Sequence, residues 1–119
     1  MRLIAAALHR VLDFVTVAAF AIAPSVLHLG GFAATLAYVL AAVHLGLTLL
    51  TQFPGSGARP VSLPLHGVIE CIVGLALVVL PWALGWSGTA RTFYIAAGGV
   101  ILAVWAFSQY RAPASQAAA

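Results

Sequence analysis

The residues that could do chemistry in this chain are two histidine–acid pairs, which contain both of its carboxylates. Asp13 lies four positions after His9, and Glu70 lies four positions after His66, in a chain of 119 residues with only two acidic residues. Residues four apart share one face of an α-helix. Each pair therefore presents an imidazole beside a carboxylate, a combination that can bind a metal ion or hold a proton.

The two pairs belong to a longer internal repeat. His9 and His66 are 57 residues apart, and Asp13 and Glu70 have the same separation. Other residues that match at this separation are Pro24 and Pro81, Leu27 and Leu84, Gly31 and Gly88, Thr35 and Thr92, and Leu45 and Leu102. Two copies of one structural unit are the simplest interpretation.

The elements that must position these pairs are predicted to be membrane-spanning helices. The chain is 64% hydrophobic and 6% charged, with a mean hydropathy of +1.12, so a globule of this length cannot bury its apolar surface. A membrane helix needs about 20 apolar residues. The charge-free stretches, 14–58, 71–90 and 92–110, hold two, one and one such helices. We predict an all-α fold, a transmembrane four-helix bundle with helices near 8–29, 32–53, 64–86 and 91–110.

The chain is predicted to be one membrane domain, 1–119, built of two parallel two-helix repeats. Repeat 1 covers 8–53 and repeat 2 covers 64–110, each with two transmembrane helices. Each copy has an even number of spans, so both point the same way, related by a pseudo-twofold axis along the membrane normal. The Pro- and Gly-containing stretch 54–63 is predicted to be a linker, and 111–119 a disordered tail.

Arginine determines the expected orientation, because the chain has no lysine. Four of the five arginines fall on the side of the termini and the middle loop, whereas Arg91 alone falls on the other side. By the positive-inside rule, both termini are expected in the cytoplasm. The net charge of +3 fits contact with anionic lipid, so the lipid bilayer is the expected partner and nucleic acid is not.

Helix packing is expected to rest on small residues, because lipid removes the hydrophobic drive between helices. These are Gly67, Cys71 and Gly74 on the third helix, Ala33, Ala37 and Ala41 on the second, and Gly99 and Ala103 on the fourth. Aromatic residues near the helix ends are expected to lie in the headgroup region, with Phe53 and Tyr110 at the inner surface.

The pseudo-twofold axis would bring the two histidine–acid pairs to equal depth, where they could face one another across the bundle. Arg10 could add a positive charge to this cluster. His44 is expected at the same level, on one stripe with Thr48 and Thr51, because the second helix runs opposite to the first and third. The candidate polar cluster is therefore His9, Arg10, Asp13, His44, His66 and Glu70.

Four interpretations of this cluster stay open. It could be structural, with the carboxylates satisfied by histidine, Arg10 and backbone amides. It could be a metal site for Zn, Fe or Mn, with the candidate ligands His9, Asp13, His66 and Glu70. Haem could be held axially by His9 and His66. Proton or ion movement is the fourth interpretation, although the sequence shows no continuous polar track to the outer face.

The second repeat resembles a known family of bacterial membrane proteins. After Glu70, the motif residues are Gly74, Pro81, Trp82, Gly85 and Trp86. This pattern is similar to the SPW-repeat family of small bacterial integral membrane proteins, in which a serine precedes Pro-Trp; Leu80 stands in that place here. The likeness covers mainly residues 66–110, and the first repeat keeps the proline without the tryptophan. The resemblance implies a helical fold in the bacterial inner (cytoplasmic) membrane, and it implies no settled activity.

The expected function is that of a small, non-enzymatic structural or accessory subunit with no cofactor. It would pack with itself as a homo-oligomer or with a larger membrane complex. The sequence contains no phosphate loop, no Ser-His-Asp group open to water and no nucleic-acid motif. The alternative is a metal- or haem-binding redox or ion- and proton-handling membrane protein that uses the histidine–acid cluster.

Overall fold

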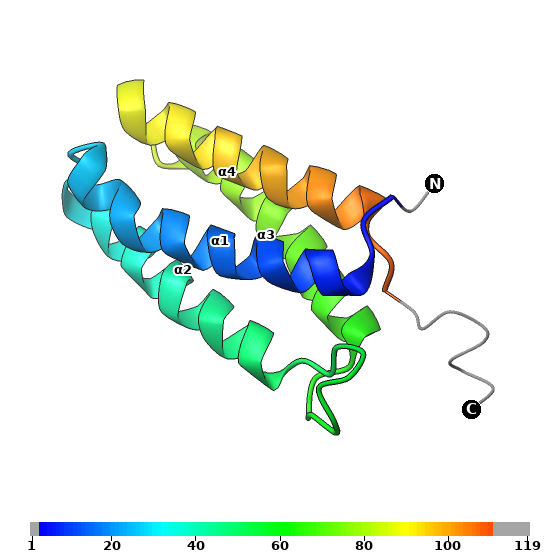
Figure 1. The fold of residues 1–119 in the computed structure, drawn as a ribbon. Coiled ribbons are helices and arrows are strands. Elements are labelled where there is room, and N and C mark those ends of the chain that lie inside the picture. Colours follow the sequence, from blue (N-terminus) through cyan, green and yellow to red (C-terminus); the bar gives the residue numbers. More distant parts are fainter. Residues whose placement is uncertain (1–2, 111–119) are drawn as a thin grey trace.

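The computed structural model describes residues 3–110 as four long helices with short connections (Figure 1). The helices are α1 (Ala6–Val26), α2 (Gly31–Leu50), α3 (Leu63–Ala83) and α4 (Gly88–Phe107). All four are long and apolar enough to cross a membrane. The predicted all-α fold with four candidate transmembrane helices is therefore confirmed. The predicted tail, 111–119, lies outside the described residues.

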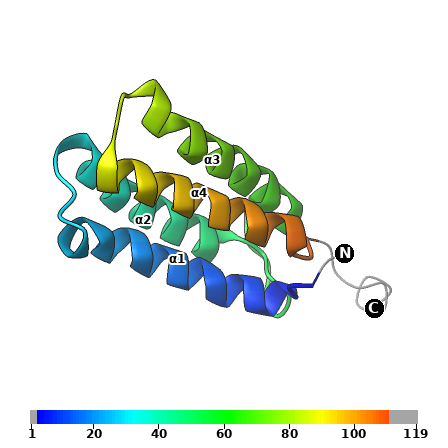
Figure 2. The ribbon, with the colours of Figure 1, turned by 90° about the horizontal axis from the view of Figure 1, so that it is seen from above.

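The helices alternate in direction along the bundle. Helices α1 and α3 run one way, and α2 and α4 run the other (Figures 1 and 2). Both described chain ends and the α2–α3 loop lie at one end, which we name the terminal end. The α1–α2 and α3–α4 turns lie at the other, the turn end. Close backbone packing joins mainly α1 to α2 and α3 to α4, so these two halves meet largely through side chains.

Each helix ends three residues earlier than the sequence predicts. After α1 the backbone of His28 is left-handed (φ 53°), and after α3 that of Gly85 is left-handed (φ 68°), which turns the chain out of the helix. The N–H of Leu29 donates to the carbonyl oxygen of Pro24, and that of Trp86 to Pro81, so the last turns keep their hydrogen bonds. At the terminal end, the early ends leave residues 51–53 and 108–110 outside the helices, among them Thr51, Phe53, Ser108 and Tyr110.

Extended segments tie the terminal end together. Ile4, before α1, forms a parallel β-bridge with Ser108, after α4. Thr51, after α2, forms another with Val61, before α3. The segment that enters each half is therefore bonded to the segment that leaves the other half.

The buried side chains are apolar in one part of the bundle and polar in another. An apolar cluster fills the middle and the turn end, and its fully enclosed members are Phe20, Ala33, Ala37, Ala41, Leu77, Tyr94 and Ile101. Within residues 3–110, the buried polar and charged side chains gather at the terminal end instead: His9, Asp13, His44, Thr48, Thr51, His66, Glu70 and Ser108. The bundle therefore places one polar centre beside an apolar interior.

Helices α3 and α4 cross closely at two glycines. A Cβ atom on Gly98 would lie 2.7 Å from the carbonyl oxygen of Gly74, a separation that no real Cβ adopts. The prediction that Gly99 and Ala103 make this contact is wrong. Ala103 is exposed, and a Cβ on Gly99 would meet no atom of the described chain within 4 Å, because one residue turns the helix face by about 100°.

Candidate metal centre

The first two turns of α1 and α3 carry the centre. His9 and Asp13 lie one turn apart on α1, and His66 and Glu70 lie one turn apart on α3. All four side chains are buried, with exposed fractions of 0 to 4%. Each residue offers a ligand atom, and these atoms all lie within 4.8 Å of one another. The structure therefore brings both histidine–acid pairs into one site.

Each carboxylate lies against both imidazoles. Asp13 Oδ1 is 3.2 Å from Nε2 of His9, and Asp13 Oδ2 is 3.1 Å from Nε2 of His66. Glu70 Oε2 is 3.0 Å from Nε2 of His9, and Glu70 Oε1 is 3.2 Å from Nε2 of His66. Two imidazoles and two carboxylates thus alternate around one space, with one imidazole and one carboxylate from each half.

A third imidazole reaches this ring from α2. His44 Nε2 lies 3.4 Å from Oδ1 of Asp13 and 4.0 Å from Oε1 of Glu70. Its side chain is mostly buried, although less completely than those of His9 and His66. His44 therefore adds one more nitrogen donor at the level of the two carboxylates.

Two hydroxyl groups determine which nitrogen of each imidazole carries a proton. Ser108 Oγ donates its single proton to the carbonyl oxygen of Val104 (2.5 Å) and lies 2.6 Å from Nδ1 of His9. With its proton used, this oxygen can only accept, so His9 Nδ1–H donates to it. Thr51 repeats the arrangement: its hydroxyl donates to Leu47 (2.6 Å) and lies 2.8 Å from Nδ1 of His66. In a neutral imidazole, a proton on Nδ1 leaves the Nε2 lone pair free.

These Nε2 atoms aim into the space between the carboxylates. Among residues 3–110, the Nε2 atoms of His9, His44 and His66 and Oδ2 of Asp13 are buried with no hydrogen-bond partner. The carboxylate oxygens lie 3.0 to 3.2 Å from the Nε2 atoms of His9 and His66, within ion-pair distance. Buried polar atoms without partners are rare in proteins. Four of them lie close together in this centre.

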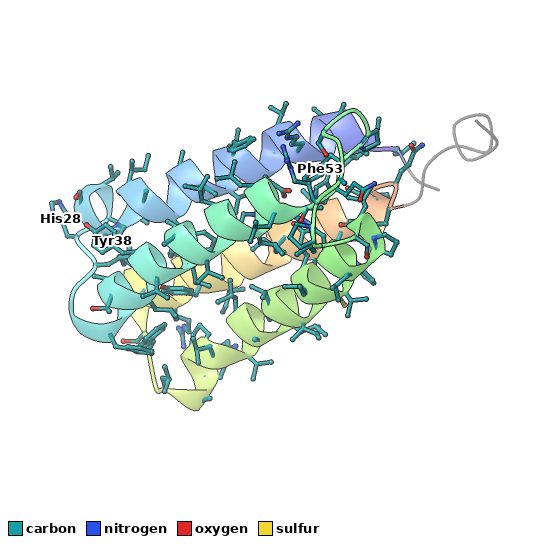
Figure 3. All side chains as sticks on the ribbon, turned by 90° about the horizontal axis from the view of Figure 1, so that it is seen from below. His28, Tyr38 and Phe53 are labelled. Atoms are coloured by element: carbon teal, nitrogen blue, oxygen red, sulfur yellow. The ribbon has the colours of Figure 1, made fainter. Side chains whose placement is uncertain are left out.

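Two aromatic rings close the centre at the terminal end. Phe53 is 2% exposed, and its ring centroid lies 5.5 Å from that of His66 and 6.3 Å from that of His9. Figure 3 shows Phe53 at this end of the bundle, with His28 and Tyr38 at the other. Tyr110 lies against His9, with ring centroids 5.2 Å apart, and its hydroxyl donates to Oε2 of Glu70 over 2.8 Å.

The Tyr110 hydroxyl is expected to stay protonated, so it can donate a hydrogen bond to Glu70. Burial, together with the charge of the Glu70 carboxylate, raises the pKa of the Tyr110 phenol above its ordinary value. A raised pKa favours the protonated phenol at neutral pH. Tyr110 therefore keeps the proton that it shares with Glu70.

Arg10 lies beside the centre and not in it. Its guanidinium carbon is 5.6 Å from the centroid of the Phe53 ring, a cation–π contact. In the part of the chain that the structure describes, no ion pair joins Arg10 to Asp13 or Glu70. Phe53 covers the imidazoles on this side, so the expected positive charge within the cluster is not supplied by Arg10.

Three of the residues that complete the centre were not assigned to the polar cluster from the sequence. They are Phe53, Ser108 and Tyr110. The 57-residue spacing carries a signal for them, because it aligns Phe53 with Tyr110 and Thr51 with Ser108. Thr51 was expected on the same helix stripe as His44, but it follows the end of α2 and contacts His66 instead. These four residues lie where the chain leaves α2 and α4.

The motif residues of the second repeat lie away from the centre. Trp82 is exposed at the turn end, where the guanidinium of Arg91 lies 4.8 Å from its ring centroid. Trp86 packs against Phe32 and Tyr94. Pro81 is buried near the end of α3, Gly85 forms the left-handed turn after it, and Gly74 lies at the α3–α4 crossing. These residues shape and anchor the second half rather than the polar centre.

The donor set has defined chemistry. Imidazole nitrogens and carboxylate oxygens together bind Zn²⁺, Fe²⁺ or Mn²⁺ in proteins. A tetrahedral ion with ligands at about 2.0 Å has ligand atoms about 3.3 Å apart. The nitrogen–oxygen separations around the ring are 3.0 to 3.2 Å. The candidate ligand atoms of all four residues lie within 4.8 Å of one another, so the longer separations would have to shorten for tetrahedral coordination.

Comparisons with protein-family models, with curated proteins and with solved structures found no match. The function of the chain is therefore inferred from the chemistry of its own residues.

Proposed function

We propose that this chain is a four-helix membrane protein that holds one divalent transition-metal ion at the terminal end of its bundle. The ligands would be His9, Asp13, His66 and Glu70, with His44 as a fifth. The observation that carries the proposal is the convergence of buried Nε2 atoms that have no hydrogen-bond partner within residues 3–110. A metal ion would use the lone pairs that the protein leaves unused.

A small ion fits this centre better than haem does. Carboxylate oxygens lie within 3.2 Å of Nε2 in both His9 and His66. A porphyrin ring held between these two nitrogens would need the space that Asp13 and Glu70 occupy. The charge of two carboxylates, by contrast, matches a divalent cation.

A resident ion is favoured over one that crosses the membrane. The buried side chains between the centre and the turn end are apolar, among them Ala41, Leu77 and Ile101. An ion pathway through a membrane protein is lined by polar or ionisable groups. The centre therefore has a polar route only toward the terminal end.

The hydroxyl contacts also support a metal site. Metal-bound histidines usually donate their second ring N–H to an oxygen, which fixes the orientation of the ring. Ser108 does this for His9, and Thr51 does it for His66. Both imidazoles are thus held with Nε2 toward the ring of carboxylates before any ion binds.

The direct test is metal analysis of the full-length protein in detergent after exposure to Zn²⁺, Fe²⁺ or Mn²⁺ and removal of free ion. We expect about one ion per chain. His9→Ala and His66→Ala should lose it. His28→Ala is the matched control, because His28 is exposed at the turn end. If the wild type holds no more of any of these ions than the two centre variants, the proposal fails.

The second candidate is a structural or accessory subunit without enzyme activity. It is favoured by the way the ring joins α1 to α3, since protonated imidazoles could hold the same carboxylates without metal. Glu70→Gln separates the two candidates. In a metal site it should weaken ion binding by at least about tenfold with the helices intact. In a structural site it should be mild, because an amide keeps most hydrogen bonds.

The finer architecture is part of the proposal. The bounds of α3 and α4 equal those of α1 and α2 moved by 57 residues, which supports two parallel repeats related by an axis along the membrane normal. Membership of the SPW-repeat family, location in the bacterial inner membrane and packing with itself or a larger complex stay predictions. Reporter fusions after Ser56 and Ala119 should report the cytoplasm, and a fusion after Ser87 the outside. A cytoplasmic signal at Ser87 would contradict this topology.

A further inference from the structure

Different side chains enclose the centre on its two sides. Toward the turn end it meets the packed apolar core. Toward the terminal end it meets the rings of Phe53 and Tyr110, which pack with the buried side chains of Ala6 and Leu63. Beyond these rings lies an open pocket of about 750 Å³, which Phe53 and Tyr110 line together with polar groups such as Gln52 and Ser62. The shortest way from the centre to the outside therefore passes one of the two rings.

Phe53 is the more deeply buried of the two rings. It is 2% exposed, and the guanidinium of Arg10 lies over its outer face. Its N–H donates to Thr51, and its carbonyl oxygen accepts from both the backbone N–H (3.0 Å) and the hydroxyl (2.8 Å) of Ser56. These contacts hold its backbone, and its ring packs against the imidazoles of His9 and His66.

Tyr110 is the more exposed of the two rings. It follows the end of α4 and is partly exposed. Its side chain is held by the hydrogen bond to Glu70 and by a place against Gly67 on α3. At the spacing of 57 residues, Gly67 corresponds to Arg10. The absence of a side chain at Gly67 therefore makes room for the Tyr110 ring where the first half has a long cation.

The fit between Tyr110 and Gly67 is close. A Cβ atom on Gly67 would lie 2.9 to 3.0 Å from three ring atoms of Tyr110. Such contacts are shorter than van der Waals packing permits. An alanine at this position would push the ring off α3 and away from Glu70.

Building on the proposed metal function, we propose that Tyr110 is a gate through which the ion passes between the pocket and the centre. In the closed position the phenol donates to Oε2 of Glu70 and its ring lies on Gly67. In the open position the phenol leaves Glu70, the ring turns into the pocket, and the ligands become accessible. Closing restores the hydrogen bond and excludes water from the ion.

A gate has a kinetic signature that a ligand or a positioning residue lacks. The hydrogen bond from Tyr110 to Glu70 can form with or without the ion, so weakening it changes the rates of entry and exit together. The dissociation constant then stays within about threefold, whereas both rates rise by about 10- to 100-fold, since a charge-assisted hydrogen bond no longer has to break at each opening.

The test compares two variants of the full-length protein in detergent. Gly67→Ala displaces the ring, and Tyr110→Phe keeps the ring but removes its hydroxyl. Gly46→Ala is the matched control, because Gly46 is also a helical glycine near the terminal end, and a Cβ there would meet no described atom within 4 Å. Zn²⁺ binding is measured by rapid mixing, and Zn²⁺ release is measured by mixing loaded protein with excess chelator.

We expect both rates to rise in Gly67→Ala and in Tyr110→Phe, with wild-type rates in Gly46→Ala. If the wild type binds Zn²⁺ and both variants exchange it at the wild-type rate, the gate is refuted and the metal site stands. A larger dissociation constant for Zn²⁺ with an unchanged rate of Zn²⁺ binding would also refute the gate. Tyr110 would then be a positioning residue. Failure of the wild type to bind any of the three ions would refute the metal site itself. If Gly67→Ala does not fold, Tyr110→Phe decides alone.

Discussion

Removing the hydroxyl that accepts from an imidazole should weaken metal binding without removing a ligand. Within residues 3–110, Ser108→Ala takes away the one acceptor found for Nδ1–H of His9, and Thr51→Val does the same for His66. Both hydroxyls and both imidazoles are buried, with exposed fractions of 0 to 1%. Water therefore cannot easily take the place of the lost oxygen.

The expected size follows from these contacts. Loss of the oxygen that orients a metal-bound histidine typically costs 10- to 100-fold in affinity, or about 1.4 to 2.7 kcal/mol. We expect this loss for Ser108→Ala and for Thr51→Val. The two hydroxyls hold different imidazoles, so the double variant should lose roughly the product of the two effects, about 10²- to 10⁴-fold.

The assay is a competition titration with a chromophoric chelator, using full-length protein in detergent. Thr48→Val is the matched control. Thr48 is equally buried, and its hydroxyl donates to the carbonyl oxygen of His44 over 2.9 Å, as that of Thr51 donates to Leu47. Among the residues that the structure describes, however, the Thr48 hydroxyl forms no hydrogen bond with an imidazole nitrogen. The control therefore removes a hydroxyl from the same helix region without freeing a histidine ring.

Conservative variants refine the test. Thr51→Ser and Ser108→Thr keep the hydroxyl and should keep most of the affinity. If Thr51→Val and Ser108→Ala bind the ion as tightly as Thr48→Val does, the hydroxyls do not orient the ligands. The assignment of the proton to Nδ1 would then lose its basis.

Three further predictions concern packing, ionisation and assembly. Gly98→Ala should lower the free energy of unfolding by about 1 to 3 kcal/mol in mixed micelles, because its Cβ would meet Gly74, whereas Gly99→Ala should not; equal effects would contradict the close crossing. The raised pKa of Tyr110 predicts that its phenol stays protonated beyond about pH 10, seen as absorbance near 295 nm that differs between wild type and Tyr110→Phe only above that pH. Chains split after Ser56 should bind the ion only when both pieces are co-expressed; binding by either piece alone at full affinity would rule out a shared centre.

The helices could be predicted from the sequence because lipid imposes a simple rule. A long apolar stretch must satisfy its backbone hydrogen bonds internally, so charge-free runs of sufficient length become helices. The residues at which those helices end could not be predicted from apolar composition. The predicted second and fourth helices run on through Phe53 and Tyr110, but the chain leaves α2 after Leu50 and α4 after Phe107 to form β-bridges with distant segments. Apolar composition does not record such pairings.

The centre could be predicted in part for a related reason. Spacing of four residues places His9 with Asp13 on one helix face, and the 57-residue offset indicates that the second pair lies at the same depth. Arg10 was expected in the centre because it is next to His9 in the sequence, but it lies beside the centre, over the Phe53 ring. Adjacent residues on a helix point about 100° apart, so a neighbour of His9 in sequence faces away from the site to which His9 contributes. Ser108 was missed because its role needs the pairing of the chain's two ends.

Both halves of the protein contribute to the centre, where the buried polar and charged side chains of residues 3–110 gather. Each imidazole belongs to one half and takes its orienting hydroxyl from the other: His9 from Ser108, and His66 from Thr51. Neither half can therefore complete its own donor set. The departures from this symmetry are equally informative, because the first half alone adds a third nitrogen through His44, and the second half alone adds a hydrogen-bonding ring through Tyr110. A symmetric frame would thus hold the ion, and its two asymmetric residues would determine how the ion is finally coordinated and from which side it is reached.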